Sequence, residues 1–355
     1  CAAAASQAAA VLLLTGIAPP EIHLHTPGGI TFCLPVEDAH MSGNAAVCTV
    51  RKDAGDDPDI TNGVRITASV HRIEKGVTIE GGAGVGRITR PGLAMPVGEA
   101  AINPGPRQQI ADAVHRAAQQ NGYGGGFSVT ISVKDGEALA AQTYNGHLGI
   151  VGGISILGTS GIVEPMSEKA LVDTIRLELD SLYAQGQRIA FLCPGNYGAD
   201  FARDTLGLDL ERAVKCSNFI GEAFDHAAYR GYPEILLVGH AGKLVKMAAG
   251  VMNTHSSVAD ARQEIFTAHA ALCGAPRETL EGLMAAISVD ACVELLDEVN
   301  LRQPVLSRIG REMENRIALR MKGQARVEFI MFTGKYGVLA ESAGARTLCE
   351  RLKLQ

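Results

Sequence analysis

The chain has 355 residues with a net charge of −6, and 46% of them are hydrophobic and 20% charged. This length predicts two domains, and this composition predicts sizeable cores instead of disorder. A basic footprint for nucleic acid is missing, and no stretch reaches the roughly 18 apolar residues of a membrane span. We therefore expect neither nucleic acid nor membrane as a partner. Eight cysteines without CxxC spacing predict reduced thiols in a cytoplasmic protein and no protein-bound metal.

The first part of the chain, residues 1–148, predicts an α+β domain with acidic and glycine-rich loops. An Ala/Leu-rich helix ends at Gly16, and a hairpin turns at Pro27–Gly29. The N-terminal stretch lacks the basic region of a signal peptide, so a buried helix is the better interpretation. The remaining predicted elements are strands at 45–53, 64–74 and 127–136 and a helix at 104–122.

From residue 149 onward, continuous apolar strands alternate with helices. This alternation predicts a Rossmann-like parallel α/β domain at 149–355, with a helical extension and a C-terminal hairpin. The predicted strands are 188–193, 234–240 and a hairpin near 327–341, and the predicted helices are 167–186, 217–231, 255–271, several within 277–322, and 343–352. The predicted fold class is therefore α/β with α+β.

A dense group of polar side chains lies between Gly239 and Arg262, directly after the apolar strand EILLVG. In an open α/β sheet, ligands bind outside the carboxyl ends of the strands, so this run is a candidate crevice for a ligand with several carboxylates or phosphates. GHAGK within it is too short for a P-loop. The alternative interpretation is that its lysines are helix-surface cations and its histidines are structural.

Two loops of the first domain are weaker candidates. The segment Glu80–Arg87 is glycine-rich, but Pro91 obstructs the helix that a dinucleotide fingerprint requires. This segment is better interpreted as a loop whose backbone amides bind an anion, with Arg87 and Arg90 beside it. The segment Lys52–Gly63 is acidic and resembles an EF-hand only superficially. It is either a solvated turn or a polar edge of the site.

Two further candidates belong to the predicted second domain. Pro194–Gly198 lies between a buried strand and a helix, so it is either a helix-entry turn or a backbone contact for a small cofactor. Glu164 lies near a helix start, where its carboxylate either complements the helix dipole or binds a cofactor hydroxyl or ammonium group.

Several long segments together resemble the CbiD family, in order and spacing: KDAGDDPDITNG, GGAGVGRITRPGLAMPVGEAAINPGPR, LGIVGGISILGTSGIVEPMSEKAL, PGNYG, SNFIGEAFDHA and ILLVGHAGKLVKMAAGVMNTHSSVADAR. The resemblance covers essentially the whole chain. It implies methylation of C-1 of cobalt-precorrin-5B to give cobalt-precorrin-6A in anaerobic cobalamin biosynthesis. S-adenosyl-L-methionine would be the donor, and cobalt would be present only in the substrate. Family members usually carry a segment ending in TTGT or TTGS before the cysteine that matches Cys1, where this sequence begins.

The resemblance implies that the candidate residues form a binding site for the methyl donor and the macrocycle between the two domains. The expected methyl-donor contacts are Gly152, Gly153, Thr159, Glu164, Gly195, Asn196 and Tyr197. The expected macrocycle contacts are Asp56, Arg87, Arg90, His240, Lys243, Lys246, Thr254 and Arg262, with Arg107 a further candidate cation. Asp57 or His255 is the expected proton acceptor.

Two other functional classes remain as alternatives. A non-catalytic corrinoid carrier needs no donor pocket, so the glycine loops at the sheet edge disfavour it. An NAD-dependent oxidoreductase predicts GxGxxG at the start of a helix, and the sequence has no such unit. The expected partners are the cobalt-precorrin, a second copy of the chain in a homo-oligomer, and transiently the neighbouring pathway enzymes.

Overall fold

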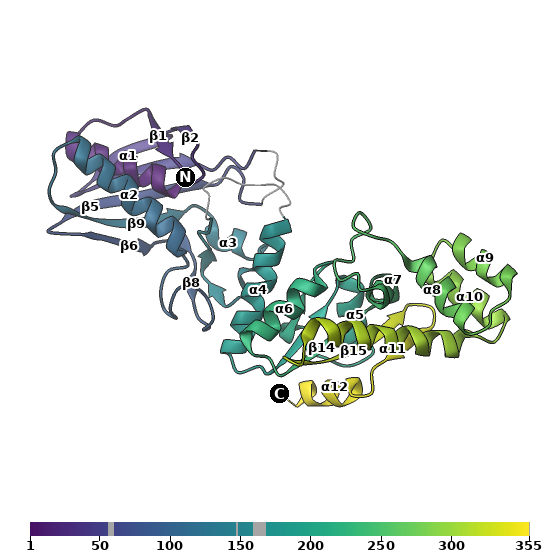
Figure 1. Cartoon of the computed structure of the whole chain (residues 1–355). Helices are drawn as coiled ribbons and strands as arrows, with labels where there is room; N and C mark the ends of the chain where they lie inside the picture. Colours follow the sequence, from purple (N-terminus) through teal and green to yellow (C-terminus); the bar gives the residue numbers. More distant parts are fainter. Residues whose placement is uncertain (56–59, 147, 159–167, 355) are drawn as a thin grey trace. The chain divides into compact units, whose positions relative to one another are not determined.

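The protein is described by a computed structural model that covers residues 1–55, 60–146, 148–158 and 168–354 (Figure 1). Its contacts divide the chain into two compact units, Cys1–Ser167 and Glu168–Gln355. The sequence placed the boundary after residue 148, which is too early. Short strands at Ile150–Val151 (β10) and Gly153–Ile154 (β11) pair with strands of the first unit, so this segment folds with that unit.

Unit 1 is built on one five-stranded sheet with the strand order β3-β4-β5-β9-β6. The strands are Asp38–Ser42 (β3), Ala45–Arg51 (β4), Arg65–Ile73 (β5), Val77–Gly81 (β6) and Gly126–Val133 (β9). Only the β6–β9 pair is parallel. Because β5 and β9 alternate buried and half-buried residues, one face of the sheet carries the core.

Helices Ala2–Thr15 (α1) and Pro104–Gln120 (α2) lie side by side over that core face (Figure 1). The alanines of α1 are small, so the helix packs closely against α2, β4 and β5 at the same time. The helix ends as predicted at Gly16, whose φ of 71° is left-handed and whose amide donates to Leu12 O at 2.8 Å.

The remaining elements of unit 1 are short. The predicted hairpin is confirmed, with strands Glu21–His25 (β1) and Thr31–Pro35 (β2). The glycine-rich segment forms two-residue strands, Gly84–Val85 (β7) and Arg87–Ile88 (β8), which pair with β11 and β10. A short helix, Gly136–Ala140 (α3), follows β9.

Unit 2 holds a second five-stranded sheet with the order β13-β12-β14-β15-β16. The strands are Ile189–Cys193 (β12), Ala213–Lys215 (β13), Glu234–His240 (β14), Arg326–Thr333 (β15) and Gly337–Glu341 (β16). Strands β13, β12, β14 and β15 are parallel, as predicted, and β15 and β16 form the predicted antiparallel hairpin.

Helices cover both faces of this sheet. One core lies between the strands and Glu168–Ala184 (α4), Ile220–Arg230 (α6) and Arg302–Met321 (α11). The opposite core lies between the strands and Asn196–Asp204 (α5) and Ala345–Lys353 (α12). Alternate residues of β12 and β14 enter the two cores, which explains why both strands are apolar throughout.

The helical extension consists of Arg262–Leu272 (α8), Arg277–Ala285 (α9) and Val289–Glu298 (α10). The sequence predicted that α8 begins at His255, and this is wrong. Residues 255–261 form a loop, and Ala261 has a left-handed φ of 55° directly before the helix. Across the described parts of the chain, no helix is long and apolar enough to cross a bilayer.

Candidate functional site

Four parallel strands of unit 2 end at the same edge of the sheet, and the loops after β12 and β14 carry predicted site residues. Strand β12 leads through Gly195, with a left-handed φ of 90°, into α5. Strand β14 leads through His240 into Ala241–Leu244 (α7). An added methyl group at Gly239 would lie 2.3 Å from Leu244 Cδ1 and 3.2 Å from Pro194 Cδ, so any larger residue would displace these side chains. The predicted run after β14 therefore does begin at the carboxyl edge.

Five side chains form what we call the edge cluster: Asn196, Tyr197, Lys215, His240 and Lys243. Lys215 Nζ donates to Asn196 Oδ1 at 3.4 Å, and the rings of Tyr197 and His240 are 6.0 Å apart between centroids. Lys243 Nζ would lie 3.5 Å from a Cβ at Gly195 and donates to Ser217 O at 3.4 Å. The structure thus brings together the predicted residues of the β12 and β14 loops.

Burial changes the pKa values of two residues in the edge cluster, His240 and Lys243. Burial lowers the pKa of His240, and the Asp290 carboxylate partly opposes this effect. His240 Nδ1 accepts a hydrogen bond from the Gly242 amide at 3.1 Å, so the proton of the neutral ring is on Nε2. Burial also lowers the pKa of Lys243, against a smaller opposing effect of Cys216. The edge cluster therefore offers hydrogen-bond donors suited to carboxylates.

Lys246 holds the following loop in place instead of pointing to solvent. Its side chain is 4% exposed, and Nζ donates to Thr254 O at 3.2 Å and to Ala259 O at 2.9 Å. Thr254 is buried too, and its amide donates to Asn218 O at 2.9 Å. Neither residue offers its side chain to a ligand here, so both predicted substrate contacts are better explained as supports of the site.

Arg262 and His255 flank this loop. Both Arg262 Nε and Nη2 donate to the Asp260 carboxylate, at 2.5 and 2.7 Å, and this pairing lowers the pKa of Asp260. An added methyl group at Gly242 would lie 4.0 Å from Arg262 Nη1, which places the guanidinium beside the start of α7. His255 is exposed, and its Nδ1 accepts from the Ser257 amide at 3.2 Å. Its Nε2 therefore carries the proton of the neutral ring.

A cavity of about 470 Å³ lies beside the start of α6, which follows β13. Its lining combines Phe219, Met252 and Asn253 with charged side chains of three helices. Those charged residues are Glu168, Lys169, Asp173, Arg176, Glu222 and Arg320. Most of them are already paired: Arg176 donates to Glu222 at 2.9 Å, and Arg320 contacts Asp225 at 2.6 Å.

Two backbone amides of the glycine-rich segment in unit 1, which the sequence predicted to meet an anion, donate to other backbone groups. Gly82 N donates to Ile131 O at 2.8 Å, and Gly86 N donates to Ile154 O at 2.9 Å. A Cβ at Gly84 would lie 2.0 Å from Val133 O. Gly84 and Gly86 therefore allow backbone to pack closely against backbone.

The cations of unit 1 differ in how far they are free to bind a ligand. Arg107 is committed to the fold, because it donates to Ile102 O and Ile79 O, both at 2.9 Å. Arg87 is exposed and contacts Glu80 at 3.2 Å and Gly98 O at 3.0 Å. Arg90 packs its aliphatic stem against Gly149. Of these three, Arg87 is the most accessible to an anionic group.

The other predicted site residues lie in unit 1 or outside the described residues. Gly152 and Gly153 belong to unit 1 and not to the predicted second domain, and a Cβ at Gly153 would lie 2.3 Å from Gly84 O. Gly153 is thus a packing residue. Asp56, Asp57, Thr159 and Glu164 lie outside the described residues, as does Ser167, the first residue of the predicted helix 167–186.

Sequence reasoning missed Lys215, Asn218 and Arg320. Lys215 is the last residue of β13 and Asn218 lies just after it, and this three-residue strand is too short to give a periodic signal. Arg320 lies near the end of α11, and its guanidinium sits 2.8 Å from where a Cβ of Gly221 would be. That glycine, second in α6, is the one signal in the sequence of a close approach there.

Fold and site together define a two-unit mixed α/β protein with hydrogen-bond donors gathered at one sheet edge. The CbiD family model matches residues 1–165, and the model of the CbiD C-terminal domain matches residues 253–343. A relative from Ruminiclostridium cellulolyticum is 50% identical over 94% of this chain and 87% of its own length. The chain belongs to the CbiD family.

The relatives carry one name. The protein from R. cellulolyticum is a cobalt-precorrin-5B C(1)-methyltransferase, as are one from Alkaliphilus metalliredigens (42% identity; 99% of this chain, 93% of the relative) and one from Citrobacter koseri (39%; 99% and 93%). The crystal structure of the cobalamin biosynthesis protein cbiD from Archaeoglobus fulgidus is 29% identical and covers 73% of this chain and 81% of that one, with a TM-score of 0.38.

Proposed function

We propose that this protein transfers a methyl group from S-adenosyl-L-methionine to C-1 of cobalt-precorrin-5B, giving cobalt-precorrin-6A. The observation that carries the proposal is the similarity over 94% of the chain to a curated C(1)-methyltransferase. Cobalt belongs to the substrate in this reaction. Homo-oligomerisation and contact with neighbouring pathway enzymes remain predictions.

We further propose that unit 2 is Rossmann-like and binds the donor at the carboxyl edge of its sheet. Gly195 leads into α5, whose first-turn amides have no partners within the helix and suit the donor's carboxylate. Tyr197, 78% exposed, offers a ring for the adenine or ribose. S-adenosyl-L-methionine, when bound, supplies an electrophilic methyl group on a positively charged sulfur.

The chemical step needs orientation more than covalent help from the protein. The electron-rich ring carbon attacks the methyl carbon, and the carbon–sulfur bond breaks with its electron pair remaining on sulfur. Holding carbon, methyl and sulfur in line supplies most of the acceleration. In this proposal Lys243 and the Nε2–H groups of His240 and His255 bind carboxylates of the macrocycle.

The tautomers of His240 and His255 indicate whether either ring is suited to accept a proton from the substrate. Because Nδ1 already accepts a backbone amide in His240 and in His255, each neutral ring presents Nε2–H as a donor. We therefore favour donor roles for both histidines. Asp57 remains the proposed acceptor of any proton that leaves the ring. Near-normal turnover of Asp57→Asn would remove it from this role.

The donor site is tested by binding of S-adenosylhomocysteine to Gly195→Val, measured by calorimetry. A side chain there meets Lys243 Nζ and the donor, so we expect affinity to fall at least about tenfold. Gly186→Val is the matched control, since Gly186 also has a positive φ, 97°, but no neighbour within 4 Å. Equal affinity of both variants would place the donor elsewhere.

The acceptor contacts are tested by the methyl-transfer assay itself, with cobalt-precorrin-5B and labelled donor. Lys243→Met should raise the KM for the macrocycle by about tenfold, because one charge-assisted hydrogen bond is lost. Lys353→Met, on α12 and paired with Glu350 at 2.8 Å, is the control. An unchanged KM in Lys243→Met would show that the macrocycle does not reach this edge.

A further inference from the structure

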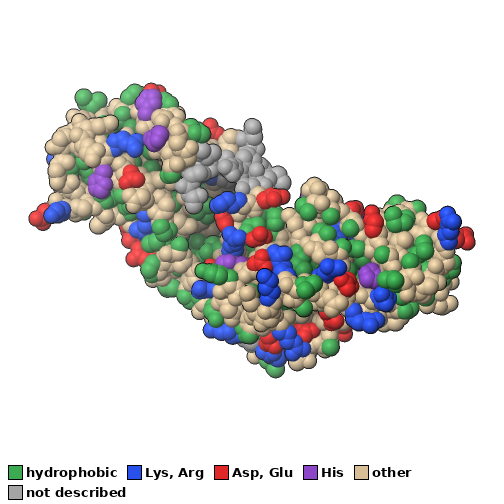
Figure 2. All heavy atoms as spheres, in the orientation of Figure 1, with side chains coloured by type: hydrophobic (Ala, Val, Ile, Leu, Met, Phe, Trp, Pro, Cys, Tyr) green, Lys and Arg blue, Asp and Glu red, His purple; other side chains and the backbone are tan. Residues whose placement is uncertain are grey.

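The exposed face of the β1–β2 hairpin gathers metal-ligating side chains that the methyl transfer does not use. Strand β1 alternates strictly, with Ile22 and Leu24 buried and Glu21, His23 and His25 exposed. Cys33 on β2 lies directly opposite His23. In Figure 2, histidine side chains are visible over the part of unit 1 where β1 and β2 lie.

The register brings these side chains close together. The bonds from Thr26 N to Ile30 O and from Val36 N to Pro20 O frame the hairpin, so His23 and Cys33 form a pair without hydrogen bonds between them. Side chains of such pairs are closer than those of hydrogen-bonded pairs. Glu21, two residues from His23, projects from the same face.

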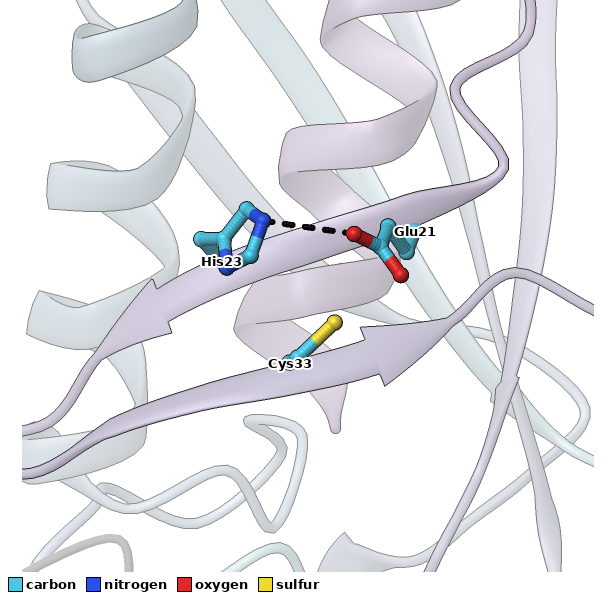
Figure 3. Close-up of side chains that lie close together, drawn as sticks. All are labelled: Glu21, His23 and Cys33. Carbon is cyan, nitrogen blue, oxygen red and sulfur yellow. Dashed lines mark ion pairs between the residues drawn. The ribbon is translucent and has the colours of Figure 1, made fainter.

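Figure 3 shows the resulting convergence of one thiol, one imidazole and one carboxylate. The ligand atoms of Glu21, His23 and Cys33 all lie within 4.8 Å of one another, and His23 Nε2 is 3.3 Å from Glu21 Oε1. The Cys33 thiol also hydrogen-bonds Glu21, which raises the pKa of Cys33. Cys33 is the most accessible of the eight cysteines, since each of the others is buried or half-buried.

We propose that Glu21, His23 and Cys33 bind a divalent zinc or cobalt ion on the surface of unit 1. Sulfur, nitrogen and oxygen donors together suit these borderline metals, and water would take the fourth position. Metal bonds of about 2.0–2.3 Å require donor atoms roughly 3.5 Å apart. Because all three side chains are exposed and their ligand atoms already lie within 4.8 Å of one another, we expect side-chain rotation to close this gap without movement of the strands.

Binding has a defined proton balance. The metal replaces the hydrogen bond between Cys33 and Glu21, and the thiol releases one proton when it becomes a thiolate ligand. In the metal-free pair His23 Nε2 donates to the Glu21 carboxylate, so its proton moves to Nδ1 by way of solvent when Nε2 and the carboxylate become ligands, and the neutral ring releases no net proton. Affinity therefore rises with pH until the Cys33 thiol is deprotonated. Because the site is open to solvent, we expect metal exchange to be fast.

The test is a Co²⁺ titration of the full chain, without corrinoid, followed by absorption spectroscopy. The wild type should bind one Co²⁺ and show a thiolate-to-cobalt charge-transfer band with strong ligand-field bands of four-coordinate geometry. Cys33→Ser should lose the charge-transfer band, and His23→Ala should weaken binding at least about tenfold.

Two variants serve as controls for this titration. Cys273→Ser removes a half-buried thiol of unit 2, and His40→Ala removes an exposed histidine outside the three-residue cluster. Both should titrate like the wild type. The proposal is overturned if the wild type gives no saturable charge-transfer band, or if Cys33→Ser retains that band.

Discussion

Glu178, a carboxyl group on α4, is 8% exposed and lies against β13. Burial raises the pKa of Glu178 to about 7, and the Lys215 amide and charge offset only part of this rise. The folded protein thus holds a proton that the unfolded chain releases. The contribution of protonated Glu178 to the free energy of unfolding is fully present below its unfolded pKa near 4.5. It is lost as the pH rises through its folded pKa of about 7.

We predict that unit 2 loses up to about 3 kcal/mol of unfolding free energy from Glu178 between about pH 5 and about pH 8. Glu178→Gln removes the ionisation and should flatten this dependence. Urea unfolding at both pH values measures it. An equally steep pH dependence in the variant would show that other groups cause it.

Lys246 shows how a cation can serve a site without touching its ligand. In Lys246→Met the carbonyls of Thr254 and Ala259 lose their donor, which costs about 1–3 kcal/mol. We expect faster hydrogen exchange of the Thr254 amide and a lower urea midpoint of unit 2. The exposed Lys353→Met should change neither. Unchanged exchange in Lys246→Met would mean that the loop is held by other contacts.

Lys243 and Lys246 show which part of the candidate site could be predicted from the sequence and which part could not. The composition of the run Gly239–Arg262 predicted a polar sheet edge, and His240 and Lys243 are there. The same composition could not separate Lys243 from Lys246, because both are lysines three residues apart. Only the three-dimensional path of the loop after Gly250 makes one a rim donor and the other a buried support.

Helix α1 illustrates how an element depends on residue size. Ala4, Ala5, Ala8, Ala9 and Ala10 are fully buried against α2 and the sheet. Ala9→Leu adds volume where there is no space, and we predict a loss of about 1–3 kcal/mol in unit 1. Calorimetry compares it with Ala318→Leu on the exposed side of α11. Equal stability of both variants would mean that α1 packs loosely.

Elements with a strong period were predictable, and elements defined by tertiary contacts were not. The strands β12 and β14 and the helices α2 and α6 follow from their apolar patterns. Strands β7, β8, β10 and β11 have two residues each and exist because glycine backbones pack together. Because β10 and β11 pair with β8 and β7, Gly152 and Gly153 belong to unit 1. Their glycine spacing alone gave no indication of the partner strand.

At the scale of the whole molecule, each unit has a hydrophobic core of its own. We therefore predict two calorimetric transitions. Ile131→Ala in unit 1 and Leu237→Ala in unit 2 are both truncations of fully buried side chains, each worth about 2–5 kcal/mol. Each should lower one transition and leave the other unchanged. A single transition that both variants lower equally would show that the units unfold together.

The two transitions, identified by Ile131→Ala and Leu237→Ala, also show which unit binds the donor. A ligand that binds only the folded state stabilises the unit that holds it, by about 2.7 kcal/mol at a concentration of 100 times the Kd. We predict that S-adenosylhomocysteine raises the transition lowered by Leu237→Ala, because Gly195 and the edge cluster belong to unit 2. Gly195→Val should abolish this rise, while Gly186→Val should preserve it. If the ligand instead raised the transition marked by Ile131→Ala, the donor would bind unit 1, and the edge cluster would be left to bind the macrocycle alone.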